Sequence, residues 1–147
     1  MGNRAVITTK DKKIGVYLHW NGGRDSVEAF LKYCELQGFR YPEEDCYGWA
    51  RLCQIIANFF TEIDDTSKGL SIGIDQYSKL DTDNYDDGVY VIEKWKIIDR
   101  LYKCNSEQKV YDLKEMLKAI DEHQPESMQL FKNIKAEDIN LEESTNG

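Results

Sequence analysis

The chain has 147 residues, of which 41% are hydrophobic and 12% aromatic, so it can bury the core of one domain but hardly of two. Nineteen basic against 27 acidic side chains give a formal net charge of -8, which repels nucleic-acid phosphate, so direct binding to DNA or RNA is not expected. No apolar run approaches the roughly 18 residues of a membrane span, and the first residues lack the apolar core of a secretory signal, which favours a soluble, cytoplasmic protein.

The opening residues predict a β-hairpin. Ala5–Thr9 is rich in β-branched residues, and a polar turn separates it from a second strand over Ile14–Trp20. Because side chains alternate along a strand, one of His19 and Trp20 is expected to face the core.

A helix is expected after the Asn-Gly-Gly run at 21–23. Its apolar stripe has helical spacing and consists of Val27, Phe30, Leu31 and Cys34. Asp25 or Ser26 should cap the first turn, and Glu28 stands where Asp25 would need a capping-box partner. The helix should end near Gly38.

A second and more apolar helix is predicted to begin at Pro42, with three acidic residues in its first turn. One face carries Trp49, Cys53, Ile56, Phe60 and Ile63, and this stripe is widened by Cys46, Ala50, Ala57 and Phe59. We expect this helix at the centre of the fold, ending in the polar run 64–69.

The next segments predict a second hairpin and a third helix. Period-two alternation indicates a strand over Leu70–Ile74, and β-branched and aromatic residues indicate another over Val89–Ile98. The polar segment Asp81–Gly88 between them is expected to be the hairpin loop. From Ser106 onward a helix should follow that ends before Pro125, with the apolar residues Val110, Leu113, Met116, Leu117 and Ile120.

These elements predict an α+β fold, with an antiparallel sheet built from two hairpins and three helices mainly on one face. Residues 1–134 are assigned to a single domain, and residues 135–147 to an acidic tail that should fray because it has little to bury. A parallel sheet is the alternative, but it would need a more regular alternation of strands and helices.

The segment from His19 to Ser26 is the first candidate site, because it combines a strand end, paired glycines, an arginine and a helix start. Amides at a helix start carry partial positive charge, and an arginine can hold a phosphate with two donors. The candidate ligand-binding residues are His19, Asn21, Gly22, Gly23, Arg24 and Ser26. The segment matches neither the P-loop nor the dinucleotide fingerprint, so an ordinary turn is the competing interpretation.

The second candidate site is the acid-rich segment 81–93. Its register does not fit a calcium-binding EF-hand, because Tyr85 and Lys94 fall where oxygen ligands belong. No lysine or arginine interrupts its acids, so the segment is suited to contact a basic protein surface. The candidate partner-binding residues are Asp81, Asp83, Tyr85, Asp86, Asp87 and Glu93.

Catalytic and metal-binding patterns are not apparent. Nothing in the sequence brings the two histidines, His19 and His123, next to a nucleophile, and no two cysteines have a zinc-ligand spacing. The four cysteines are expected to be reduced, with Cys46 and Cys53 in the core of the second helix. We therefore predict no enzymatic activity, no metal and no cofactor.

Three stretches of the sequence carry a resemblance, Gly2–Thr8, Gly15–Gly23 and Gly88–Ile92 with the nearby Trp95. They look like a group of small, functionally uncharacterised acidic proteins carried by phages, plasmids and conjugative elements of gut and Gram-positive bacteria. The resemblance covers roughly the first 100 residues and implies a genomic setting but no site residue. In such a setting, compact acidic proteins without enzyme motifs are often inhibitors of host defence.

The leading hypothesis is therefore a non-enzymatic interaction protein that inhibits a host nucleic-acid-binding defence factor, such as a CRISPR nuclease, by placing carboxylates in its basic channel. The alternative is a protein that binds or sequesters a nucleotide or phosphate at the His19–Ser26 segment. A housekeeping module with an acidic surface is a second alternative.

Overall fold

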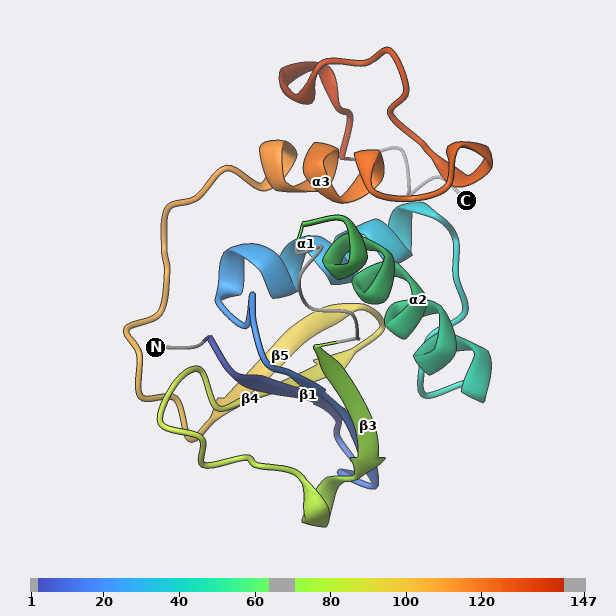
Figure 1. Ribbon diagram of the computed structural model, residues 1–147. Coiled ribbons are helices and arrows are strands. Elements are labelled where there is room, and N and C mark those ends of the chain that lie inside the picture. The colour runs from blue at the N-terminus through green and yellow to red at the C-terminus, as the bar shows by residue number, and fades with distance from the viewer. Residues whose placement is uncertain (1–2, 64–70, 142–147) are drawn as a thin grey trace.

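A computed structural model describes residues 3–63 and 71–141 (Figure 1). Its strands are β1 (Ala5–Thr9), β2 (Ile14–Leu18), β3 (Ile72–Gln76), β4 (Val89–Glu93) and β5 (Lys96–Leu101). Its helices are α1 (Arg24–Leu36), α2 (Cys46–Ile63) and α3 (Leu113–Glu122), with short 3-10 turns η1 (Tyr77–Lys79), η2 (Glu126–Met128) and η3 (Ala136–Asp138). Within the described residues, none of the helices combines the length and the apolar composition needed to cross a membrane.

The sheet is mixed. Its strand order is β3-β2-β1-β4-β5, and all neighbouring pairs are antiparallel except β1 and β4, which are parallel with Val6 opposite Val89. The α+β class is confirmed, whereas the wholly antiparallel sheet is wrong. The parallel pair arises because α1, α2 and β3 lie between β1–β2 and β4 in the chain, so β4 can return beside β1 by a long crossover.

The first hairpin is confirmed, but the second one is wrong. The stretch predicted as one strand over Val89–Ile98 folds back on itself as β4 and β5, and β3 pairs with β2 at the opposite edge. Lys94 and Trp95 form the turn, with φ of 51° and 64°. The indole of Trp95 is buried there and its Nε1 donates to the backbone oxygen of Phe39 at 3.0 Å, which explains why an aromatic residue occupies a turn.

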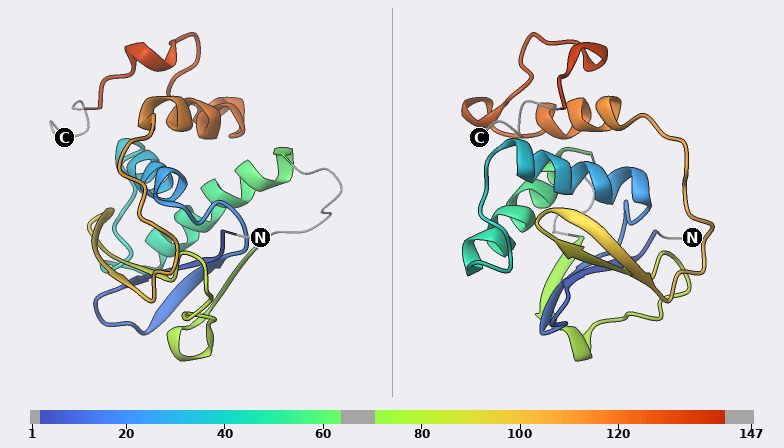
Figure 2. Two further views of the ribbon diagram at one scale, coloured as in Figure 1. Left: turned by 90° about the vertical axis from the view of Figure 1, so that its left-hand side faces the viewer. Right: turned by 180° about the vertical axis from the view of Figure 1, so that it is seen from behind.

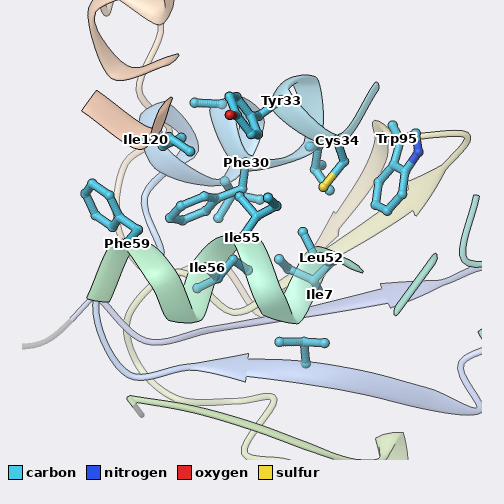
Figure 3. Packing of buried hydrophobic residues seen from close by; sticks show 14 of the residues in the cluster. Ile7, Phe30, Tyr33, Cys34, Leu52, Ile55, Ile56, Phe59, Trp95 and Ile120 are labelled. Atoms are coloured by element: carbon cyan, nitrogen blue, oxygen red, sulfur yellow. The ribbon is translucent and has the colours of Figure 1, made fainter. Parts of the chain in front are cut away.

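The three helices lie on one side of the sheet (Figures 1 and 2). Between the helices and the sheet is the main core, in which Phe30 of α1 and Ile55 of α2 meet side chains such as Ile7 of β1 (Figure 3). On the other side of the sheet, a smaller cluster of Val6, Val89 and Val91 is covered by Tyr17, Tyr77, Leu80 and Leu101. The segment that follows β3 therefore packs across the second face.

The helix starts differ from the sequence prediction. Gly23 is the N-cap of α1 and no side chain caps this end, so the capping box of Asp25 and Glu28 is wrong, and Asp25 instead accepts from the amide of Ser26. The end near Gly38 is confirmed, and this glycine has a φ of 78°. Similarly, α2 begins at Cys46 rather than Pro42, because residues 42–44 form a separate turn.

The apolar face of α2 was also only partly predicted. Leu52 and Ile55 are buried although they lay outside the expected stripe, whereas Cys46 and Ala50 are exposed. Among residues 46–60 of this helix, whose side chains the structure describes, the buried hydrophobic residues are Trp49, Leu52, Ile55, Ile56, Phe59 and Phe60. The side chain of Ile63, also expected in the stripe, lies outside the described part. Contacts with α1 as well as the sheet rotate the buried face away from the expected stripe. The expected end of this helix at 64–69 lies outside the described residues.

The third helix starts later than predicted and the C-terminal segment is better packed. Asp112 caps α3 by accepting from the amide of Glu115, while Val110 is 95% exposed in the preceding extended chain. Ile139 is 2% exposed and belongs to the main core, so fraying from residue 135 is wrong for 135–141. The remaining part of the predicted tail, 142–147, lies outside the described residues.

Candidate functional site

The acidic segment is an ordered loop built around Asn84. The side chain of Asn84 is buried, its Nδ2 donates to the backbone oxygen of Asp81 at 2.9 Å, and its Oδ1 accepts from the amides of Asp86 and Gly88 at 3.1 and 3.0 Å. Its Nδ2 also lies 3.4 Å from the backbone oxygen of Gly88, so four backbone groups of the loop are bound by one side chain. These hydrogen bonds hold the loop backbone around Asn84.

Arg4 neutralises part of the loop. Its Nε lies 2.7 Å from Oδ2 of Asp86, its backbone amide donates to the same oxygen at 3.2 Å, and its Nη1 lies 3.7 Å from Asp81. Desolvation acts to raise the pKa of Asp86, but the hydrogen bonds from Arg4 outweigh it and the pKa is lowered. Asp86 therefore remains ionised, but its carboxylate is paired with Arg4 within the protein.

The exposed part of the loop is smaller than predicted. Tyr85 is 75% exposed with a φ of 65°, and Asp81 and Asp83 on its N-terminal side are also exposed. Glu93 is separate from them at the far end of β4, where it lies 3.8 Å from Lys10. We call Asp81, Asp83 and Tyr85 the loop surface.

Asp87 does not belong to this surface, because it is only 5% exposed. It lines a cleft of about 380 Å³ together with residues from the N-terminal end of α1. The other residues of this cleft are Asn3, Asn21, Gly23, Arg24, Asp25, Ser26, Asn105, Ser106, Glu107 and Gln108. The two candidate sites of the sequence therefore meet at Asp87.

The chain between β5 and α3 forms one wall of this cleft. We call residues 102–111 the strap; it runs along the outside of the molecule from the sheet towards α3 (Figure 1). Glu107 in the strap pairs with Arg24 at 3.0 Å and with Arg100, and Oε1 of Gln108 accepts from the amide of Asp25 at 2.9 Å. No local spacing could have identified the contacts of Glu107 with Arg24 and of Gln108 with Asp25, because the residues of each pair lie 83 positions apart.

One predicted ligand residue, Gly22, has a structural role instead. A Cβ on Gly22 would lie 2.1 Å from the backbone oxygen of Asn3, so this glycine permits close packing of the chain. His19 and Trp20 are both exposed, and the expectation that one of them faces the core is wrong because β2 ends at Leu18. Neither His19 nor Gly22 lines the cleft, whereas Asn21, Gly23, Arg24 and Ser26 do.

Asp87 is the unusual group of the cleft. Its Oδ2 is the one buried side-chain oxygen or nitrogen atom without a hydrogen-bond partner in the described part of the chain. Burial raises the pKa of Asp87, although Asn105, Arg100 and Asn3 act to lower it. The guanidinium of Arg100 donates to the backbone oxygen of Asp87 while stacking on the ring of Tyr90, 3.6 Å from its centroid.

Because the pKa of Asp87 is raised in the folded protein, ionisation of this side chain is expected to lower the free energy of unfolding. In the unfolded chain this carboxyl ionises near pH 3.9, and because its folded-state pKa is higher, ionisation destabilises the fold as the pH rises through both values. We expect Asp87→Asn to raise the free energy of unfolding by about 1 kcal/mol at pH 7. Urea unfolding of both proteins from pH 3 to 8 would measure this gain, which should vanish at the acidic end; a gain that is independent of pH would contradict it.

The two histidines lie on different elements, and the cysteines differ in burial. His123 ends α3, where its Nδ1 lies 2.7 Å from the backbone oxygen of Ala119, and His19 lies at the end of β2. Cys34 is buried, Cys53 is half-buried and Cys46 is exposed, so the placement of Cys46 in the helix core is wrong. Among residues 3–63 and 71–141, no three His, Cys, Asp or Glu side chains are grouped so that they could hold a metal ion.

The described chain therefore has two surfaces suited to recognition, the loop surface around Tyr85 and the cleft around Asp87. Both are built from polar and charged groups that the tertiary structure brings into place. Comparison of the chain with protein-family models, with curated proteins and with solved structures found no match.

Proposed function

We propose that the protein is a non-enzymatic inhibitor that binds a basic surface of a host defence protein through the loop surface of Asp81, Asp83 and Tyr85. The observation that carries the proposal is Tyr85, which is 75% exposed on a loop whose backbone is held by Asn84. A tyrosine exposed to this degree on a structured loop is a suitable anchor for a protein interface.

The order of the loop supports tight binding. An interface that forms from an already ordered loop loses less conformational entropy than one that must order a flexible segment. The carboxylates beside Tyr85 add long-range attraction to a positively charged partner, which raises the association rate. Asp86 and Asp87 contribute little to this attraction, because one is paired with Arg4 and the other is buried.

The nature of the partner is proposed from charge and from the resemblance to proteins of mobile elements. The net charge of -8 favours a basic partner, and the basic channels of nucleic-acid-binding nucleases are extended surfaces of this kind. A CRISPR nuclease is the member of this class that we propose first. Carboxylates in its channel would compete with the phosphates of the nucleic acid.

The test is inhibition of DNA cleavage by purified CRISPR nucleases of different types. Asp81→Lys/Asp83→Lys/Tyr85→Ala should weaken inhibition about a hundredfold, because it removes both the anchor and the charge of the loop surface. The matched control is Asp75→Lys/Asp99→Lys, which makes the same charge change at exposed positions of β3 and β5 and should leave inhibition within about threefold.

Two results would contradict the proposal in different ways. Equal inhibition by the loop variant and the wild type would exclude the loop surface as the binding site. If the wild-type protein inhibits none of the nucleases and also fails to displace nucleic acid from them, the proposed class of partner is wrong. Melting curves of both variants establish that they are folded.

A further inference from the structure

The cleft around Asp87 has the size of a small-molecule site but an unusually polar lining. Its volume of about 380 Å³ lies within the range of known ligand pockets, roughly 300 to 1,000 Å³. Amide side chains line it from three separate segments, represented by Asn3, Asn21 and Asn105, and Ser26 and Ser106 add hydroxyls. A ligand that suits this cleft must therefore be small and rich in hydrogen-bonding groups.

The charge balance of the cleft does not favour an anion. Asp25, Asp87 and Glu107 place three carboxylates in the lining against one cation, Arg24. Arg24 is already paired with Glu28 at 3.1 Å and Glu107 at 3.0 Å, so little of its charge remains for a phosphate.

The start of α1 is also less available to an anion than the sequence suggested. The amide of Asp25 donates to Gln108, and the amide of Ser26 donates to Oδ1 of Asp25 at 2.8 Å and to the backbone oxygen of Gly23 at 3.1 Å. These bonds occupy donors that a phosphate at a helix N-terminus would need.

The unpartnered oxygen of Asp87 favours a cationic ligand with N–H donors. Asp87 is only 5% exposed, and a buried carboxylate oxygen without a donor costs free energy that a ligand N–H could recover. The guanidinium of Arg100, whose charge acts on the pKa of Asp87, donates its hydrogen bonds to the backbone oxygens of Asp87 and Val89 and to Glu107. Oδ2 of Asp87 is therefore without a donor in the described chain, although side-chain hydrogen bonds from Asn105 and Asn3 to this carboxylate act to lower its pKa.

We propose that this cleft binds a small organic cation, a primary amine or a guanidine, whose N–H groups donate to the carboxylate of Asp87. Glu107 and Asp25 provide further negative potential, and the surrounding amides and hydroxyls bind polar groups on the remainder of the ligand. This binding site is independent of the loop surface and of the partner proposed for it.

The test uses putrescine and agmatine as cationic probes and inorganic phosphate as the opposing probe. Calorimetric titration at about 0.15 M salt, where diffuse attraction to an acidic protein is screened, should show saturable binding of at least one cation and none of phosphate. In a ¹H–¹⁵N spectrum of the wild type, that cation should shift the side-chain amides of Asn3, Asn21 and Asn105.

The decisive comparison is between two variants that remove the same charge. Asp87→Asn should weaken binding of the cation about tenfold or more, because it removes the accepting carboxylate. Asp83→Asn, on the exposed loop surface, should change the affinity less than about twofold.

Three outcomes would overturn the proposal: binding of neither cation, equal weakening by the two variants, or wild-type shifts that avoid the cleft amides. If Asp87→Asn does not fold, Glu107→Gln on the strap takes its place in the comparison, and unchanged affinity there together with unshifted cleft amides would refute the site.

Discussion

Replacing Gly88 by alanine is expected to lower the free energy of unfolding by about 3 kcal/mol. Gly88 has a φ of 66°, and a Cβ at this position would lie 2.2 Å from the backbone oxygen of Leu101. Its own backbone oxygen accepts from the amide of Val6 at 2.8 Å, which begins the parallel pairing of β1 and β4. A displaced backbone here would disturb the acidic loop, the sheet and the cleft together, and urea unfolding would measure the loss.

Two other glycines separate the causes of this effect. Gly38→Ala tests the positive φ alone, because its φ is 78° and no atom lies within 4 Å of the added Cβ; we expect a loss of about 1 kcal/mol. Gly73→Ala in the edge strand β3 has neither constraint and should change stability by less than about 0.5 kcal/mol. If Gly88→Ala lowers the free energy of unfolding by no more than Gly38→Ala does, the close approach to the backbone of Leu101 does not contribute to the destabilisation.

Replacing Asp121 by alanine should cost a similar amount, about 3 kcal/mol. Asp121 is fully buried at the C-terminal end of α3, where it accepts from the hydroxyl of Tyr33 and from the amides of Leu130 and Phe131 at 2.7 and 2.9 Å. One carboxylate thus joins α1, α3 and the segment after η2. Its removal leaves three donors without this acceptor, two of them in buried hydrogen bonds.

The comparison that isolates this role uses Asp112→Ala and Tyr33→Phe. Asp112→Ala removes the N-cap of the same helix and should cost about 1 kcal/mol. Tyr33→Phe removes one donor and leaves Asp121 with two amides, so it should cost less than Asp121→Ala. Amide hydrogen exchange should show faster exchange at Leu130 and Phe131 in Asp121→Ala only; unchanged exchange there would contradict the role of Asp121 as an anchor.

The elements that the sequence predicted well are those whose signals are local. The first hairpin follows from β-branched residues on both sides of a polar turn, and the stripe of Val27, Phe30 and Leu31 is buried on α1 as predicted. Gly38 ends that helix because a left-handed residue is needed there, which glycine adopts without strain. In each of these cases, neighbouring residues are sufficient to decide the structure.

The wrong predictions share a different cause. Residues 89–98 are mostly β-branched and aromatic, so they were predicted as one strand, and the burial of Trp95, whose indole donates to the backbone oxygen of Phe39 far away in the chain, shows that the chain turns there. Likewise, the face of α2 that becomes buried depends on where α1 and the sheet lie around it. Local propensity does not contain these long-range packing terms.

In the two candidate sites as well, local properties were predictable from the sequence and long-range contacts were not. The sequence by itself determined the acidic charge, the polar composition of the loop around Tyr85 and the presence of a helix after residues 21–23. Only the tertiary structure decided that Asp86 pairs with Arg4, that Asp87 is buried, and that the strap brings Glu107 to Arg24. The physical reason is that the charge of a side chain is a property of its residue, whereas its exposure and partners depend on residues more than 80 positions away that arrive only when the chain folds.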